Sequence, residues 1–357
     1  MNSKRVSVFV LLQLTGVLGA SGAVSYSCVD LGNLNGLYGI GNDINNGGQV
    51  ACYAISASGH NHGFLYSAGL YTDLSPLGGT DNNAAAINDN GQVVGYRTAS
   101  GLYKAFVYSS GTMTTLSINA NYSSAQAINN NGLIVGEYGM STGNSDIHGF
   151  LYNAGTVTDL GGLGGNYTTP FGINTSGQIV GYSRTTNGVD HPFLYSGGRM
   201  MDLGTLWGTS GEATAINDSG QVVGLLGSPS VNSRAFLYSN GQMIDLGTMG
   251  GSGAYSAADG INNFGQIVGQ AQNGQFQMHA FLYSNGVMLD LNNLIVTNAG
   301  WTLKEAKAIN DNGQIVGLAV NTAGDQHAFL LTPIPEPAAV SLLSLGAAVC
   351  FVIRRPR

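Results

Sequence analysis

Charged side chains are scarce in this sequence. Only 9% of its 357 residues are Asp, Glu, Lys or Arg, whereas 43% are hydrophobic, which is enough apolar surface for a folded core. The few basic residues gather at the two ends, and between residues 24 and 334 seven Lys and Arg face eighteen Asp and Glu, a formal charge of −11. Because such an acidic body repels polyanions, we expect no nucleic-acid partner.

Cysteine is also rare. Of three cysteines, Cys350 falls in an apolar run near the C-terminus, which leaves Cys28 and Cys52 in the body. They allow one bridge in an oxidising compartment, but two separate buried thiols are the simpler interpretation. The sequence has no Cys-x-x-Cys pair, phosphate-binding loop, Gly-x-Ser-x-Gly elbow or His-Glu-x-x-His motif. We therefore predict no metal, no cofactor and no known catalytic motif.

Glycine, in contrast, is abundant and periodic. The 55 glycines recur with a pattern whose clearest copy, at 308–317, reads Ala-Ile-Asn-Asp-Asn-Gly-Gln-Ile-Val-Gly. The isoleucine of this pattern occurs seven times, 41 to 48 residues apart, at Ile44, Ile87, Ile128, Ile173, Ile216, Ile261 and Ile309. A period of this length indicates a repeat architecture.

Each copy is typical of four short strands. In the copy at 211–247, strand-forming segments at 213–217, 221–224, 234–239 and 242–247 are separated by Gly-containing turns and one variable loop. Between the two termini no segment has apolar residues at helical spacing over three turns. The body is therefore predicted to be all-β.

The number of strands at the two ends predicts how the repeats are arranged. A phenylalanine marks the third strand in seven copies, but the leucine of the fourth strand follows only six of them. The missing fourth strand matches residues 27–32 at the other end. We therefore predict a seven-bladed β-propeller over 24–332, closed by the N-terminal strand, with a β-solenoid or smaller paired rings as alternatives. The small residues of Ala-x-Ala-Ile-Asn favour this strand as the innermost.

The two ends indicate export. Residues 1–23 have a basic start, an apolar run and small residues before Ala23, as in a secretory signal peptide. Residues 333–357 contain Pro335-Glu336-Pro337, a predicted apolar helix at 338–353, and Arg354, Arg355 and Arg357. A tail anchor is the simplest interpretation, because the 17-residue run from Pro337, apolar apart from two serines and a glycine, has about the minimum length for a membrane span.

The order and spacing of this tail resemble the PEP-CTERM sorting signal of Gram-negative bacteria. That resemblance implies a transient stay in the inner membrane and cleavage near Pro-Glu-Pro by an exosortase-type protease. It further implies delivery to the cell surface or the extracellular matrix.

The repeats resemble the extracellular HAF repeats, which are named for a His-Ala-Phe triplet. The triplet is literal at 279–281 and 327–329, and is varied at His62-Gly63-Phe64, His148-Gly149-Phe150 and His191-Pro192-Phe193. Lys104 and Arg234 replace the histidine in the other two copies. The resemblance implies an exported repeat protein and supplies no catalytic residues.

Residues that every copy shares are expected to serve the scaffold. We interpret the repeated histidine as a structural donor, for example to a turn carbonyl. The repeated aspartate, present in six copies and replaced by Thr115 in one, is expected to cap the following turn. The Asn-Asp-Asn-Gly turns at 88–91 and 310–313 resemble half a calcium loop but lack its glutamate, which favours a plain hairpin turn.

Residues that break the pattern are the better site candidates. Trp207 near Glu212, and Trp301 near Glu305, combine an aromatic ring with a carboxylate, as in a sugar-binding platform. Loop packing explains such aromatics equally well. Other copy-specific candidates are Arg97, Glu137, Asp146, Arg184, Asp190 and Lys304.

These features favour an exported protein that binds or organises exopolysaccharide or another surface partner without catalysis. A propeller-fold polysaccharide hydrolase or lyase is the alternative, and a purely structural coat protein is a third possibility.

Overall fold

The computed structural model describes residues 24–335 apart from 34–35, 76–79, 141–145, 207, 229–230, 252 and 297–299. Ser25–Ile334 form one compact unit. The expected signal peptide, Glu336, Pro337, the apolar helix at 338–353 and the terminal arginines lie outside the described residues. In the part that is described, no helix is both long enough and apolar enough to span a bilayer.

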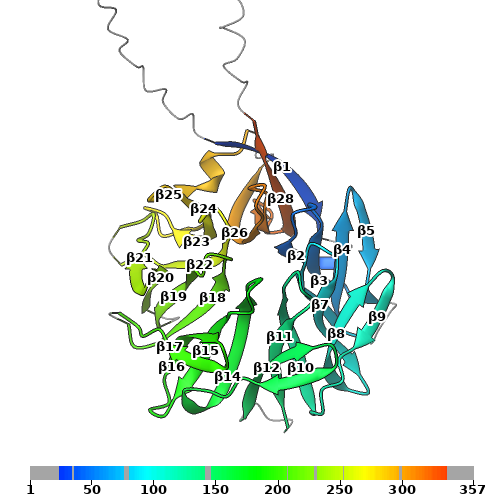
Figure 1. Ribbon diagram of the computed structural model, residues 1–357. Helices are drawn as coiled ribbons and strands as arrows, with labels where there is room; N and C mark the ends of the chain where they lie inside the picture. The colour runs from blue at the N-terminus through cyan, green and yellow to red at the C-terminus, as the bar shows by residue number, and fades with distance from the viewer. Residues whose placement is uncertain are drawn as a thin grey trace, which may run out of the picture. The chain divides into compact units, whose positions relative to one another are not determined.

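The unit is built from seven repeats of four antiparallel strands (Figure 1). Repeats 1 to 3 comprise β2 (Gly36–Ile44), β3 (Val50–Ser56), β4 (Asn61–Ser67) and β5 (Leu70–Asp73); β6 (Asn82–Ile87), β7 (Val93–Ala99), β8 (Leu102–Ser109) and β9 (Thr112–Thr115); and β10 (Tyr122–Ile128), β11 (Ile134–Gly139), β12 (Ile147–Asn153) and β13 (Thr156–Asp159).

Repeats 4 to 6 have the same order. They comprise β14 (Gly164–Ile173), β15 (Ile179–Thr185), β16 (Asp190–Ser196) and β17 (Arg199–Asp202); β18 (Gly211–Ile216), β19 (Val222–Ser228), β20 (Val231–Ser239) and β21 (Gln242–Asp245); and β22 (Ser256–Ile261), β23 (Ile267–Gln272), β24 (Met278–Ser284) and β25 (Val287–Asp290), which a short 3-10 turn (Leu291–Asn293) follows.

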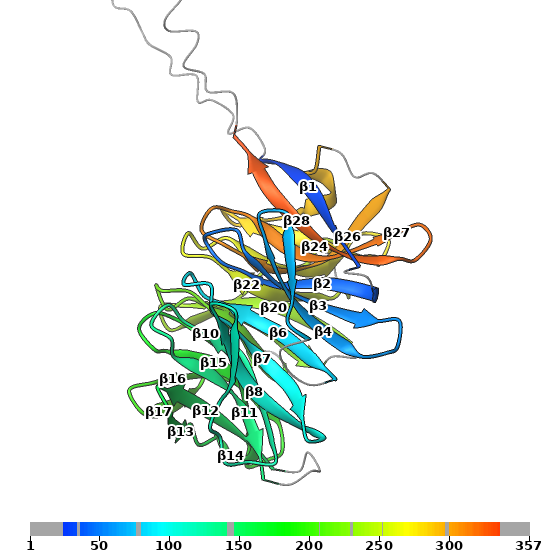
Figure 2. The same ribbon diagram turned by 90° about the vertical axis from the view of Figure 1, so that its right-hand side faces the viewer.

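Repeat 7 joins the two ends of the chain. It contains β26 (Trp301–Ile309), β27 (Ile315–Asn321) and β28 (Gln326–Ile334), and its fourth strand is β1 (Ser25–Gly32), which pairs antiparallel with β28. Both views show β1 lying along β28 (Figures 1 and 2). Tyr26 and Leu31 of β1 are buried, and His327 of β28 bonds Asp30 at 2.9 Å. The offset predicted from the strand count is therefore observed.

The core lies between neighbouring repeats. One cluster joins Ala51 and Leu74 of repeat 1 to Val93 and Phe106 of repeat 2, and comparable clusters join each following pair of repeats. The last cluster joins repeat 7 back to repeat 1. No sheet closes on itself among the described strands; neighbouring sheets instead pack face to face around a common axis (Figure 1).

One glycine explains how the strands fit so closely. Gly95 of β7 lies beside a bulge in β6, and a Cβ there would lie 1.8 Å from the carbonyl oxygen of Asn83. Glycine at this position avoids the clash. The equivalent glycine recurs in six of the seven repeats, whereas in repeat 1 Cys52 takes its place and is paired with Gly41 of the first strand.

Cys28 and Cys52 are both free thiols. Burial raises the pKa of Cys28 to about 11 and that of Cys52 to about 12, which keeps both sulfurs protonated and unreactive. The bridge that the sequence left open is not formed.

Candidate functional site

The first strands of the seven repeats surround a cavity of about 230 Å³ on the central axis. A second cavity of about 210 Å³ lies at one end of it and is lined by the Asn-containing turns that follow these strands. The Ala-x-Ala-Ile-Asn strand is therefore innermost, as expected from its small residues. The two cavities define a central channel whose two ends differ in chemistry.

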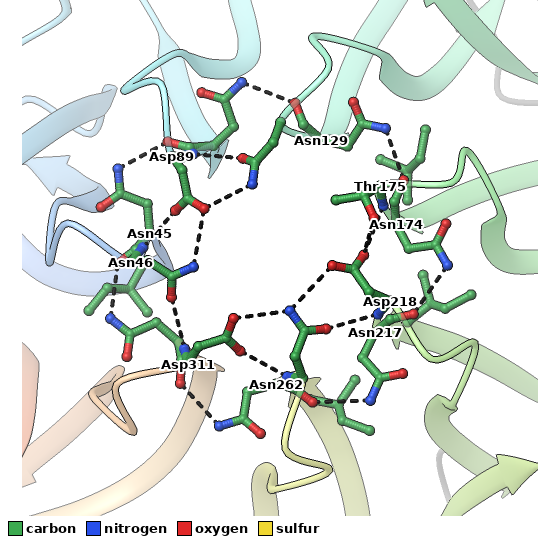
Figure 3. A pocket seen from close by; sticks show the side chains of 18 of the residues that line it. Asn45, Asn46, Asp89, Asn129, Asn174, Thr175, Asn217, Asp218, Asn262 and Asp311 are labelled. Carbon is green, nitrogen blue, oxygen red and sulfur yellow. Dashed lines mark hydrogen bonds between the residues drawn. The ribbon is translucent and has the colours of Figure 1, made fainter.

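At the turn end, seven asparagines form a continuous ring of hydrogen bonds (Figure 3). In each repeat the asparagine Nδ2 donates to the main-chain oxygen of the equivalent asparagine in the next repeat, over 2.9 to 3.1 Å. The circle closes between repeats 7 and 1, where Asn310 donates to the oxygen of Asn45 at 2.9 Å. The members are Asn45, Asn88, Asn129, Asn174, Asn217, Asn262 and Asn310, all buried.

The residues that follow these asparagines form a second ring, which lies inside the first in Figure 3 and contains three carboxylates. Asp89 accepts hydrogen bonds from the Asn46 N–H at 2.8 Å and from Asn130 Nδ2 at 2.8 Å, and Asp218 and Asp311 have comparable partners (Figure 3). The turns at 88–91 and 310–313 close as hairpin turns, with the Gly91 and Gly313 N–H groups donating back to the asparagines. Since neighbouring repeats already satisfy these carboxylates, we assign this end a structural role.

In five of the seven repeats the residue at the histidine position pairs closely with the repeated aspartate of the same repeat. His148, His191, His279 and His327 place Nδ1 between 2.7 and 2.9 Å from the aspartate, and Arg234 binds Asp245 at 3.2 Å. The same aspartates accept the N–H two residues later at 2.6 to 2.9 Å, which is the expected turn cap. The partner of the histidine is thus a carboxylate, whereas the sequence led us to expect a turn carbonyl.

Copy-specific residues line the rest of the channel. The residue two positions before the repeated isoleucine faces the axial cavity and differs in every repeat: Asn42, Ala85, Gln126, Phe171, Thr214, Asp259 and Lys307. On each first strand, the residue two positions before this one pairs with a residue of the second strand. Its partner directly follows the repeated glycine, or Cys52 in repeat 1. These seven cross-strand pairs, which we call the variable pairs, are Ile40–Tyr53, Asn83–Tyr96, Ser124–Glu137, Thr169–Tyr182, Glu212–Leu225, Ala257–Gln270 and Glu305–Leu318.

The variable pairs lie at the strand ends away from the asparagine ring and form the mouth of the channel. In repeats 1 to 4 this mouth is rich in tyrosine. Asn61 links two of the rings, because its Oδ1 accepts from the Tyr53 hydroxyl at 2.8 Å and its Nδ2 donates to that of Tyr96 at 3.3 Å. Glu137 accepts from the Tyr122 hydroxyl at 2.5 Å and from Thr169 at 2.8 Å. These tyrosines present fixed rings around half of the mouth.

In repeats 5 to 7 the same mouth is charged. The Lys307 ammonium lies 2.5 Å from Glu305 and 3.7 Å from Asp259, and Gln270 donates to Glu305 at 3.1 Å. Burial lowers the pKa of Lys307, but the carboxylates of Asp259 and Glu305 outweigh it and raise the pKa overall, so the lysine stays charged. Burial raises the pKa of Asp259, with Glu305 and Glu212 adding to the effect and Lys307 opposing it.

Asp43 is a further carboxyl group of the channel. It accepts the N–H groups of Ile44 at 2.9 Å and Ile87 at 2.8 Å. Burial nevertheless raises its pKa to about 7, with a smaller contribution from Asp89. The other six repeats carry alanine or glycine at this position.

Between repeats 4 and 5 a separate pocket of about 200 Å³ opens beside the mouth. It is lined by Tyr182 and Asp190 of repeat 4 and by Glu212, Leu225 and glycine-rich backbone of repeat 5. Burial raises the pKa of Glu212, and Asp190 adds to the effect while Lys307 opposes it.

Only some of the candidate site residues predicted from the sequence lie at the mouth of the channel. Glu212 and Glu305 belong to the variable pairs, and Glu137 joins them at the mouth. Trp207 lies outside the described residues, whereas the Trp301 ring packs on His327 with centroids 4.3 Å apart.

Three other candidates lie away from the mouth, and one lies beside it. Arg97 donates to Thr115 at 3.1 Å, Asp146 lies 3.4 Å from His148, and Lys304 sits at a bulge in β26. Arg184 pairs with Asp190, which lines the pocket between repeats 4 and 5.

Sequence reasoning missed Asp43, Asp259, Lys307 and Tyr182 as site residues. The variable residue two positions before the repeated isoleucine was the signal for two of them: Lys307 is the middle residue of Ala-x-Ala, and Asp259 holds the same position in Ala258-Asp259-Gly260. Tyr182 follows the repeated glycine, which is a second position where the copies differ.

Comparison with known proteins supports the fold and no activity. No protein-family model and no curated protein matches the chain. The acylaminoacyl peptidase of Pyrococcus horikoshii is similar with a TM-score of 0.55 at 9% identity, over 90% of this chain and 54% of the peptidase. A puromycin-hydrolyzing peptidase of Mycobacterium tuberculosis gives a TM-score of 0.52 at 10% identity, over 87% of this chain and 56% of that one.

The chain therefore spans about half the length of these two peptidases. At these identities the likeness shows the fold alone, which is all-β and propeller-like.

Proposed function

We propose that the protein is an exported seven-bladed β-propeller, closed by its N-terminal strand, that binds extracellular polysaccharide at the mouth of its channel without cleaving it. One observation carries the binding site: the residues that differ between repeats gather around the axial cavity and in the variable pairs. A scaffold needs no such variation, whereas an asymmetric ligand requires it.

The composition of the mouth supports a glycan. Tyrosine rings in repeats 1 to 4 offer flat apolar faces, and the carboxylates and amides of repeats 5 to 7 accept or donate hydrogen bonds. Carbohydrate surfaces carry both kinds of group. The signal peptide and sorting tail inferred from the sequence place this mouth outside the cell, at the surface or in the matrix of a Gram-negative bacterium.

Export rests on the tail and on an exosortase-type protease, and it can be tested apart from binding. Replacing Pro335, Glu336 and Pro337 with alanine should leave the protein in the inner-membrane fraction, because the sorting protease then lacks its recognition sequence. Immunoblots of membrane and culture fractions report this. Unchanged release of the variant contradicts the sorting proposal.

The alternative of a hydrolase or lyase keeps one supporting observation. Asp190 and Glu212 line a common pocket in unequal surroundings, since Asp190 is paired with Arg184 while burial raises the pKa of Glu212.

The decisive experiment incubates the full-length protein with the host's own extracellular polysaccharide and follows both retention and chain length. Retention at constant length is the expected result. Shortened chains contradict the binding proposal in favour of the enzyme, and absence of retention favours a structural coat protein.

A further inference from the structure

The pocket between repeats 4 and 5 has the size of a subsite for one sugar ring. Its volume is about 200 Å³, below the roughly 300 to 1,000 Å³ of sites for drug-sized ligands. It adjoins the mouth, because Tyr182, Glu212 and Leu225 belong both to its lining and to the variable pairs. A glycan lying across the mouth can therefore place one residue in it.

The carboxylate of Asp190 is already neutralised. Arg184 binds it with two parallel bonds, Nε to Oδ1 at 2.9 Å and Nη2 to Oδ2 at 3.1 Å. The guanidinium also lies over the ring of Tyr167, 5.2 Å from its centroid, which fixes its plane. Asp190 therefore adds shape and hydrogen-bond acceptors to the pocket but little net charge.

The carboxylate of Glu212 is not balanced in this way. Among the described residues no hydrogen bond or ion pair reaches its oxygens. The cation that acts on it, Lys307, is held by Glu305 and Asp259, so three carboxylates share one ammonium. A half-buried carboxylate without a partner attracts a positively charged or strongly donating ligand group.

Tyr182 supplies the aromatic part of the pocket lining. The ring of Tyr182 stacks on Tyr167 at 5.7 Å with an interplanar angle of 12°, and Phe171 packs against it at 5.7 Å. A ring held on two sides cannot rotate away, so it offers a fixed face for the C–H surface of a pyranose. Leu225 completes the apolar part of the lining.

We infer that this pocket binds an amino sugar with a free amine, the sugar ring against Tyr182 and its ammonium against Glu212. The inference rests on the proposed function and names its ligand class. The acidic body, with a formal charge of −11 over residues 24–334, favours a cationic glycan and disfavours an anionic one.

The test measures binding of the full-length protein by calorimetry at about pH 6, where most of the glucosamine amines are protonated. Glucosamine oligosaccharides are compared with N-acetylglucosamine oligosaccharides of the same length, which differ only in the charge and bulk of the amine. The free-amine series should bind at least about ten-fold more tightly, as expected for a hydrogen bond to a charged group. The isosteric variant Glu212→Gln should abolish this difference.

Two further variants locate the effect. Asp146→Asn removes one exposed carboxylate that does not line the pocket and should keep the full preference. Leu225→Trp, which fills the pocket, should weaken binding of both series. If Glu212→Gln retains the preference, the cation is held by the general field of the acidic body and the inference is overturned.

Oligolysine of equal charge separates a sugar from a basic peptide. Binding of oligolysine that depends on Glu212 and matches the glucosamine series overturns the sugar assignment. If the wild-type protein fails to bind the host polysaccharide as well, the proposed function itself has failed. Retention of that polysaccharide together with equal binding of both sugar series removes only the amino-sugar inference.

Discussion

At the scale of single residues, each position of the asparagine ring requires a side chain that both donates and accepts hydrogen bonds. Asn217 donates from Nδ2 to the oxygen of Asn262 at 3.1 Å and to Gln221 Oε1 at 2.8 Å, and its Oδ1 accepts the Gln221 N–H at 3.0 Å. Both Nδ2 hydrogens and the Oδ1 of this buried side chain are therefore bonded, and the direction of each bond matters.

Replacing Asn217 with aspartate keeps the shape but removes the donor. The new carboxylate faces two acceptor oxygens, so we expect a loss of stability on the order of 3 kcal/mol in urea unfolding. Protonation at low pH restores a donor and should reduce the loss. The control is Asn240→Asp, on an exposed hairpin turn, which should change little. Equal losses in both variants would contradict a special role of the ring.

Asp43 predicts a pH dependence of stability. Because of burial, its folded pKa of about 7 lies above the ordinary aspartate value of 3.8, so between these pH values the folded protein keeps a proton that the unfolded chain has lost. The stabilisation is complete below about pH 4, falls as the pH rises to about 7, and is gone above it.

Asp43→Asn should lack this fall, as thermal unfolding from pH 4 to 8 would reveal. The exposed-site variant Asp146→Asn should retain it. A wild-type stability that rises steadily over this range, with no difference in Asp43→Asn, would show that Asp43 is ionised throughout.

At the scale of strands, repetition made most of the architecture predictable. The buried phenylalanines Phe106, Phe150, Phe193, Phe236 and Phe281 and the leucines of the fourth strands mark each strand unambiguously. Counting them assigned residues 27–32 to repeat 7, because that repeat lacks a fourth strand of its own and its third strand would otherwise be an unpaired edge. The structure extends this strand to Ser25–Gly32.

The site was less predictable because it depends on which side chains of different repeats face the same cavity. Glu212 and Glu305 stood out as copy-specific, but their spacing in the chain does not show that both act on Lys307 and Asp259. Trp301 stood out equally and packs on His327 instead. Only the cross-strand register distinguishes a copy-specific residue at the mouth, such as Glu305, from one that packs elsewhere, such as Trp301.

The strand β1 should carry a large share of the stability of repeat 7. Tyr26 is 1% exposed among Leu291, Leu303 and Phe329, whereas Val29 on the same strand is 46% exposed. Tyr26→Ala should therefore cost about 3 to 5 kcal/mol, and Val29→Ala less than about 1 kcal/mol. Thermal unfolding compares the two. Similar small losses would mean that β1 is not packed as described.

At the scale of the whole molecule, the seven repeats divide their work between the two ends of the channel. The turn end is uniform because each asparagine must match the next one around the circle, and any exception interrupts a hydrogen bond. The mouth is free of this constraint, since the main-chain pairing of its strands lies within each repeat and does not require particular side chains. Variation between repeats is therefore tolerated at the mouth, where the proposed ligand would bind.

Closure of the circle predicts the effect of removing β1. Deleting residues 24–33 takes Tyr26 and Leu31 out of the core, removes Asp30 from His327 and exposes the edge of β28. The loss should exceed that of Tyr26→Ala, and the bare edge should promote self-association. Thermal unfolding and light scattering measure both effects.

A peptide of residues 24–33 added in trans supplies the control, because it can pair with β28 again and should restore both the melting temperature and the monomer. A deletion variant that melts as the full chain does would show that the ring holds together without β1. The asparagine bonds from repeat 7 to repeat 1 would then be sufficient for closure.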